Sequence, residues 1–216
     1  MLTLVIGNKN YSSWSLRPWY LLKKFDIEFE EIRLVFDTPE FYSELKNYSL
    51  AGKVPILVDD GVSVWESLAI CEYLADKYPD KNMWPKDITK RAQARSISCE
   101  MLAGFGALRN TMPMNCRATG RKVKIDKAVQ KDIDRICMIW HECREANAES
   151  GPWLFGEFSI ADAMYAPVAS RFRTYEVPLD NVESDYVDTV LNNPVYQEWL
   201  ADSKAEAEVV EHEEVG

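Results

Sequence analysis

The sequence predicts a small α/β unit that is followed by an all-helical unit. Short apolar runs rich in Val and Ile alternate with stretches of helical spacing over about the first eighty residues. A turn-rich stretch follows at residues 78–86, and beyond it the strand pattern disappears. We therefore expect one domain over residues 1–79 and a second over residues 87–216.

The first domain is expected to fold in the order β-α-β-α-β-β-α. Thr38 can cap a short helix that Pro39 opens, and Asp59-Asp60-Gly61 predicts the turn of a hairpin. This closing hairpin is expected to run antiparallel to the rest of a small mixed sheet. The expected strands cover residues 2–6, 28–34, 54–58 and 62–65, and the expected helices cover residues 13–24, 39–45 and 66–78.

The second domain is expected to hold three long helices and two short ones. Pro113 is expected to kink the first long helix, because proline removes an internal hydrogen bond, and Pro167 lies in the middle of the third. Residues 205–216 contain five Glu and are expected to form a frayed, solvated tail. The expected helices cover residues 88–118, 124–148, 159–172, 186–191 and 194–200.

Composition argues against several classes of function. The net charge of −10, with no basic stripe to offset it, disfavours nucleic acid as a partner. No apolar stretch approaches the roughly 20 residues that span a bilayer, so no membrane partner is expected. The five Cys form no CxxC pair, which is typical of free thiols in the cytoplasm. The two His lack ligand spacing, so no metal site is expected.

Hydroxyl side chains gather directly after the first expected strand, in the turn Tyr11-Ser12-Ser13. Either serine can serve simply as the N-cap of the helix that follows. The same place suits an anion, because a helix begins there with unpaired backbone N–H groups. Lowering the pKa of a thiol by two units from about 8.5 needs roughly 2.7 kcal/mol of preferential thiolate stabilisation. One hydroxyl donor and the helix terminus can supply that amount.

Two further residue pairs in the first domain each allow a structural and a functional interpretation. Val54-Pro55 is either an ordinary start of a strand or, if the bond is cis, a turn that leaves the Val54 backbone open to an extended peptide. Glu66-Ser67 is either a capping pair before a helix or a site for an amino-acid head group. In the second case Glu66 accepts an ammonium group and Ser67 holds a carboxylate.

These three elements occur in the order found in cytosolic glutathione transferases, and the chain resembles that superfamily, whose N-terminal half is thioredoxin-like. The resemblance implies that the turn after the first strand activates the thiol of glutathione. It also implies that Val54-Pro55 pairs with the cysteinyl residue and that Glu66-Ser67 holds the γ-glutamyl group. The resemblance continues into Phe155–Asp162, which is similar to a buried capping box with Ser159 at the N-cap and Asp162 three residues on.

Within the superfamily, the pattern of Ser12, Ser13, Ser15 and Arg17 resembles the zeta class and its bacterial relatives, which hold the thiolate with a serine. Trp14 stands where zeta members typically carry cysteine, which argues against maleylacetoacetate isomerase activity. Lys53 stands where they commonly have glutamine, and it offers a positive contact for a glutathione carboxylate. Tyr11 remains an alternative donor to the thiolate.

The resemblance therefore implies a glutathione transferase that uses glutathione as co-substrate, holds no metal and forms a homodimer. The implied catalytic residues are Ser12 and Ser13, and the implied glutathione-binding residues are Tyr11, Lys53, Val54, Pro55, Glu66 and Ser67. Candidates for contact with a small electrophile between the domains are Phe105, Arg109, Met112 and Arg171, although the apolar ones equally suit a helix core. The alternatives are an isomerase of the maleylacetoacetate type and a non-catalytic binding or assembly module.

Overall fold

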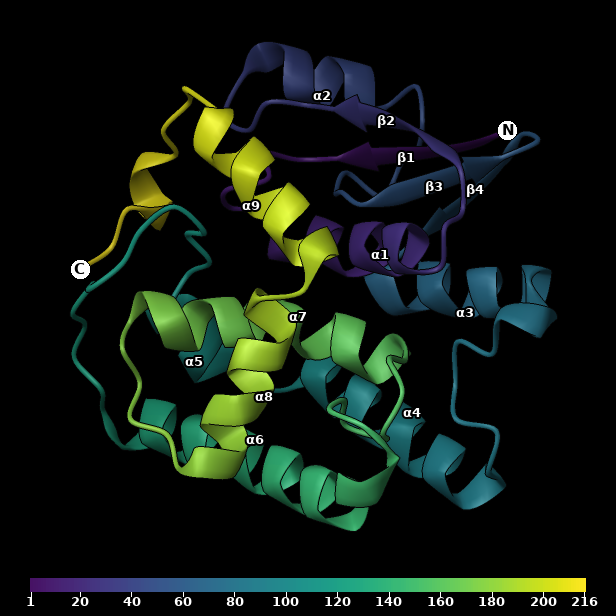
Figure 1. Ribbon diagram of the computed structural model, residues 1–216. Coiled ribbons are helices and arrows are strands. Elements are labelled where there is room, and N and C mark those ends of the chain that lie inside the picture. Colours follow the sequence, from purple (N-terminus) through teal and green to yellow (C-terminus); the bar gives the residue numbers. More distant parts are fainter.

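The computed structural model describes residues 1–216 and places a four-stranded sheet beside a group of helices (Figure 1). The strands are β1 (Leu2–Ile6), β2 (Phe29–Arg33), β3 (Ile56–Asp59) and β4 (Val62–Trp65), and their order across the sheet is β2-β1-β3-β4. β1 runs parallel to β2 and antiparallel to β3, and β3 and β4 form an antiparallel hairpin. This confirms the predicted mixed sheet with its antiparallel closing hairpin.

Helices cover both faces of this sheet. The side chains of β1 point alternately to the two faces, and apolar ones lie on both. Leu4 and Ile6 join the large core cluster with α1 (Ser13–Lys24) and α3 (Ser67–Lys77). Val5 points the other way and packs with residues of α2 (Pro39–Leu45) in a small separate cluster. As expected, the Thr38 hydroxyl caps α2 by accepting a hydrogen bond from the Phe41 N–H at 3.2 Å.

The second half of the chain is helical, and the large core cluster continues into it without a break. Its central element is α7, which carries Pro167 inside it as predicted and packs against α1, α4 and α8 (Figure 1). None of the helices has both the length and the apolar character needed to cross a membrane. The helices are α4 (Ile88–Ala103), α5 (Gly106–Thr111), α6 (Lys127–Ala146), α7 (Ile160–Thr174), α8 (Asn181–Leu191) and α9 (Pro194–Ala205), with 3₁₀ turns η1 (Pro79–Lys81), η2 (Ala148–Ser150) and η3 (Glu211–Glu213).

The prediction of one long helix over residues 88–118 is wrong. α4 ends at Ala103; its C-cap Gly104 has an extended backbone, and Phe105 then takes a left-handed conformation with φ of 56°. A Cβ at Gly104 would lie 2.7 Å from the carbonyl oxygen of Glu100, so this close turn of the backbone requires glycine. The short helix α5 follows, and Pro113 lies outside any helix instead of kinking one.

The prediction of a frayed tail is also wrong. The C-terminal segment, residues 206–216, lies along residues 112–126 and the loop before α1 (Figure 1). Its Val210 side chain is buried, and its glutamates pair with Arg33, Arg117 and Arg121. Opposite charge therefore holds in place a segment whose composition alone suggests solvation.

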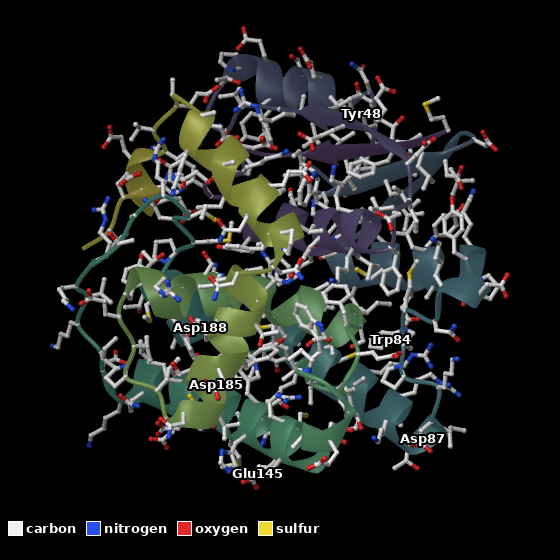
Figure 2. The ribbon with its side chains drawn as sticks, viewed as in Figure 1. Tyr48, Trp84, Asp87, Glu145, Asp185 and Asp188 are labelled. Carbon is white, nitrogen blue, oxygen red and sulfur yellow. The ribbon has the colours of Figure 1, made fainter.

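The connection between the two halves is packed as well. Trp84 lies between α3 and α4, where its indole N–H donates a hydrogen bond to Glu72 of α3 at 3.0 Å (Figure 2). Arg95 of α4 pairs with the same carboxylate at 2.9 Å. These contacts hold the two halves against each other at α3 and α4.

Candidate functional site

Two adjoining cavities form one cleft at the beginning of α1. The larger, of about 570 Å³, reaches from the Tyr11-Ser12-Ser13 turn to Arg171 and the C-terminal segment. The smaller, of about 310 Å³, lies beside Pro55 and Glu66. The two cavities share four lining residues, which are Trp14, Lys53, Val54 and Arg109. Residues from three separate stretches of the first domain thus meet at one place, as the order of the motifs predicts.

The turn at the start of α1 leaves hydrogen-bond donors unused. Ser12 is the N-cap residue, but its side chain makes no capping hydrogen bond, and the backbone N–H groups of Trp14 and Ser15 have no partner in the protein. The hydroxyls of Ser12 and Ser15 lie 2.6 Å apart, and Ser15 Oγ accepts a hydrogen bond from the Gly7 N–H at 3.3 Å. The turn therefore presents hydroxyl and amide donors to the cleft, which suits an anion.

Tyr11 lines the cleft, but its hydroxyl is engaged elsewhere. It donates to Glu214 Oε1 at 2.6 Å and accepts from Arg117 at 2.6 Å. Burial, together with the hydrogen bond to Glu214, raises the pKa of the phenol above its usual value. These contacts with the C-terminal segment make Tyr11 a poor donor to a ligand in the cleft.

The other two motifs supply further open backbone groups. The Val54-Pro55 bond is cis, and neither the N–H nor the C=O of Val54 has a hydrogen-bond partner in the protein. Glu66 has a φ of 70°, a strained conformation for this residue type, and its side chain is exposed. The first-turn N–H groups of α3, which begins at Ser67, are likewise unpaired. The Ser67 hydroxyl is fully buried and donates to the Trp14 carbonyl at 2.9 Å.

Buried positive charge lies directly behind this cleft. Arg17 is fully buried, donates to the carbonyl oxygens of Ser13 and Met164 at 3.0 Å each, and stacks on Trp14. Arg171 is also buried, and its burial lowers its pKa to about 10, which leaves it charged at neutral pH. Neither side chain forms an ion pair, and Arg171 lines the larger cavity, where its charge can meet an anion. Arg17 lines neither cavity.

The candidates for the second substrate divide into two groups. Arg109 and Arg171 line the larger cavity, whereas Phe105 and Met112 are buried in the large core cluster and line neither cavity. Helical spacing related Phe105, Arg109 and Met112 to one another but could not tell the core face of the helix from the face toward the cleft. No sequence pattern indicated that His212 and Glu213 of η3 would line the same cavity. No group of three or more His, Cys, Asp or Glu side chains is arranged to hold a metal ion.

Comparison with known proteins identifies the family of this chain. Residues 8–76 match the model of the glutathione S-transferase N-terminal domain, and residues 126–202 match that of the C-terminal domain. The chain is 38% identical over 185 residues to glutathione S-transferase Z2 of Arabidopsis thaliana, and the match covers 80% of each protein. It is 43% identical over 98 residues to a probable maleylacetoacetate isomerase of Caenorhabditis elegans, a match that covers 45% of each protein.

A solved structure agrees with the sequence comparisons at the level of the fold. A glutathione transferase homolog from Burkholderia gl BGR1, solved with bound glutathione, superposes with a TM-score of 0.73 at 23% identity. The superposition covers 95% of this chain and 99% of that one. Together with the two domain matches, these likenesses show that the chain belongs to the glutathione S-transferase family.

Proposed function

We propose that the chain is a glutathione transferase that stabilises the thiolate of glutathione with Ser12 and adds it to a small electrophile. The observation that carries this proposal is the meeting of unpaired donors in one cleft: the start of α1, the Val54 backbone and the start of α3. The fold alone would not require three sets of open polar groups at one place, because buried backbone groups are normally paired.

Glutathione is proposed to lie in the cleft as an extended peptide. Its cysteinyl backbone pairs with the N–H and C=O of Val54, as an added strand would. Its γ-glutamyl carboxylate receives the free N–H groups at the start of α3, next to Ser67, and its ammonium group meets the exposed carboxylate of Glu66. The exposed Lys53 lines both cavities and is placed to meet the glycyl carboxylate. The sulfur then faces the turn at the start of α1.

Ser12 is the preferred donor to the sulfur because of the hydroxyl behind it. A hydroxyl both donates and accepts, and Ser15 Oγ already accepts from the Gly7 N–H. In the structure the Ser12 hydroxyl donates to Ser15 Oγ at 2.6 Å. Rotation of both hydroxyls reverses this bond, so that Ser15 donates to Ser12 and the Ser12 proton is left for the thiolate. Such a chain of hydrogen bonds strengthens its last donor. Ser13 makes no side-chain hydrogen bond and is the neighbouring alternative.

The electrophile is proposed to bind on the Arg109 and Arg171 side of the larger cavity, close to the sulfur. Holding the two reactants together there lowers the barrier by proximity. Isomerisation of the maleylacetoacetate type is a second candidate, because several relatives carry that name and the same thiolate would serve it. Trp14, which stands where zeta members typically carry cysteine, is the residue that separates the two candidates.

The decisive experiment compares wild type with Ser12→Ala, Ser13→Ala and the double variant. We expect Ser12→Ala to raise the pKa of bound glutathione, read from thiolate absorbance, by roughly two units. We expect its conjugation rate at slightly acid pH to fall about 100-fold across a panel of electrophiles. Ser15→Ala should cost only about fivefold, roughly 1 kcal/mol, because it removes one supporting hydrogen bond. Equal rates in wild type and the double variant would refute the serine assignment.

A non-catalytic module with the same fold is distinguished by glutathione itself. The proposed enzyme should be retained on immobilised glutathione and eluted by free glutathione. Lys53→Ala together with Glu66→Ala should weaken this retention without changing the fold, since both side chains are exposed. If immobilised glutathione does not retain the wild-type protein, the non-catalytic module is favoured.

A homodimer is the proposed assembly. Val62 and Trp65 lie on the edge strand β4 with 54% and 51% of their surfaces exposed, and Trp65 also lines the smaller cavity. Apolar side chains on an exposed edge strand favour association with a second copy. Sedimentation equilibrium should give twice the mass of the chain, and Trp65→Lys should shift it toward the monomer. A wild-type mass equal to one chain would contradict this proposal.

A further inference from the structure

The loop that carries the serine turn, residues 7–12, is held in place by the C-terminal segment. Glu206, the C-cap residue that follows α9, accepts hydrogen bonds from the N–H groups of Lys9 at 2.6 Å and Asn10 at 3.1 Å. Its carboxylate also pairs with Arg33 at 3.3 Å, and only 6% of its side chain is exposed. One buried carboxylate thus receives two successive amides of the loop.

The Glu206 carboxylate is the only acceptor that these two amides have in the structure. Lys9 and Asn10 are buried, and their N–H groups have no other acceptor. Other contacts also hold this stretch, since Asn8 Oδ1 accepts from the Phe36 N–H at 2.8 Å and Lys9 Nζ pairs with Glu31 at 2.9 Å. Arg117 links the loop to the C-terminal segment, because it donates its backbone N–H to the Asn10 side chain at 2.9 Å and a guanidinium N–H to the Glu206 carbonyl at 3.0 Å. Without Glu206, the two buried N–H groups would be left unpaired, which costs free energy. The loop would avoid this cost by moving.

We infer that Glu206 is a positioning residue for Ser12. This inference rests on the proposed function, in which the Ser12 hydroxyl donates to the thiolate. Such a donor must be held within about 0.5 Å of its working position by the groups around it. Ser12 lies two residues after Asn10, and its own N–H donates to the Asn8 carbonyl at 2.8 Å within the same loop. A shift at Lys9 and Asn10 therefore moves the hydroxyl.

The charge of Glu206 makes this role separable from an electrostatic one. A carboxylate disfavours a nearby thiolate, so removing its charge would, by that effect alone, lower the pKa of the bound thiol. Loss of position has the opposite sign, because a misplaced hydroxyl stabilises the thiolate less and the pKa rises. The direction of the change therefore identifies the cause.

The test compares wild type with Glu206→Ala and Glu206→Gln, each with bound glutathione. We expect Glu206→Ala to raise the pKa of the bound thiol by about one unit and to lower kcat about tenfold at slightly acid pH. The KM for glutathione should change less than about threefold, because the Val54 and α3 contacts stay in place. Glu206→Gln keeps one acceptor oxygen and should fall between wild type and Glu206→Ala.

The matched control is Glu208→Ala. Glu208 lies in the same C-terminal segment as Glu206. Its carboxylate pairs with Arg33 at 2.9 Å and makes no hydrogen bond with the loop. The Glu208→Ala variant should leave the pKa of the bound thiol and kcat unchanged. If Glu206→Ala does not fold, the Glu206→Gln protein carries the test alone: a raised thiol pKa supports the inference, and an unchanged or lowered one overturns it.

A double variant separates this inference from the proposed function. If Glu206 acts through Ser12, Glu206→Ala combined with Ser12→Ala should be no slower than Ser12→Ala alone. If Ser12→Ala raises the thiol pKa while both Glu206 variants leave it unchanged, the positioning role is refuted and the proposed function stands. If Ser12→Ala itself has no effect, the serine assignment fails and this inference fails with it.

Discussion

Two helices of this protein, α1 and α7, begin with a serine, and their beginnings are built in opposite ways. At α7, Asp162 accepts hydrogen bonds from the Ser159 N–H at 2.8 Å and its hydroxyl at 3.1 Å, and the Ile160 N–H donates to the Met83 carbonyl. At α1, the Ser12 side chain makes no capping bond, and the free N–H groups behind it face a cleft. Both starts are buried, so burial alone does not distinguish them.

The difference separates a structural helix start from one that is open to a ligand. At α7 the donors are satisfied by a residue three positions on, which confirms the predicted capping box. At α1 no acidic residue stands in the first turn, and the guanidinium groups of Arg109 and Arg171 line the same cavity as Ser12. A helix start that lacks both a cap and an anion of its own can receive one from outside.

The largest effect is expected from removing the acceptor at α7. Asp162→Ala should lower the free energy of unfolding by about 3 kcal/mol or more, because it leaves buried donors of Leu154, Ser159 and Tyr186 unpaired. The melting temperature should fall by roughly 6–12 °C. Differential scanning calorimetry measures this change. A loss below about 1 kcal/mol would show that α7 does not depend on its cap.

A second effect concerns pH. Burial raises the pKa of Asp162 from its ordinary value of 3.8 to about 6. The folded state therefore binds this proton more tightly, and the resulting stabilisation is present below the ordinary pKa and is lost as the pH rises through about 6. Relative to Asp162→Asn, wild type should gain about 3 kcal/mol between neutral pH and pH about 3. Urea titrations of both proteins across this range measure the gain, and parallel curves would contradict the raised pKa.

The smallest effect sharpens the comparison most directly. Ser159→Ala should cost about 1 kcal/mol of stability and leave the pKa of bound glutathione unchanged. Ser12→Ala should do the reverse, with a change in stability within about 0.5 kcal/mol, because its hydroxyl caps nothing. Chemical denaturation and thiolate absorbance on the two proteins give both quantities. Similar stability losses in the two variants would mean that Ser12 is an ordinary cap.

Local signals predicted most of the fold. The strand β1, the helix α1 and the hairpin of β3 and β4 follow from apolar periodicity and from turn residues, whose effects extend over a few positions. The end of α4 at Gly104 was missed because periodicity continues past it, whereas the left-handed Phe105 breaks the backbone. The domain limits at residues 79 and 87 stay a prediction.

The candidate site was only partly predictable, for a physical reason. The order of the serine turn, Val54-Pro55 and Glu66-Ser67 was enough to place them around one cleft, because a small sheet brings these loops together. The C-terminal segment was missed, since the Lys9 and Glu206 groups that join it to the loop are 197 residues apart. No pattern of neighbouring residues indicates a contact between positions so far apart. The five glutamates among residues 205–216 predicted a solvated tail instead.

That separation has a consequence for how the protein is made. Domains generally fold from the N-terminus as the chain is synthesised, at about 5–20 residues per second. The amides of Lys9 and Asn10 then wait for Glu206, 197 residues later, which is roughly 10–40 s of translation. During this interval the sheet can form while the loop before α1 lacks its acceptor. The first part of the site to leave the ribosome is therefore among the last to acquire its working shape.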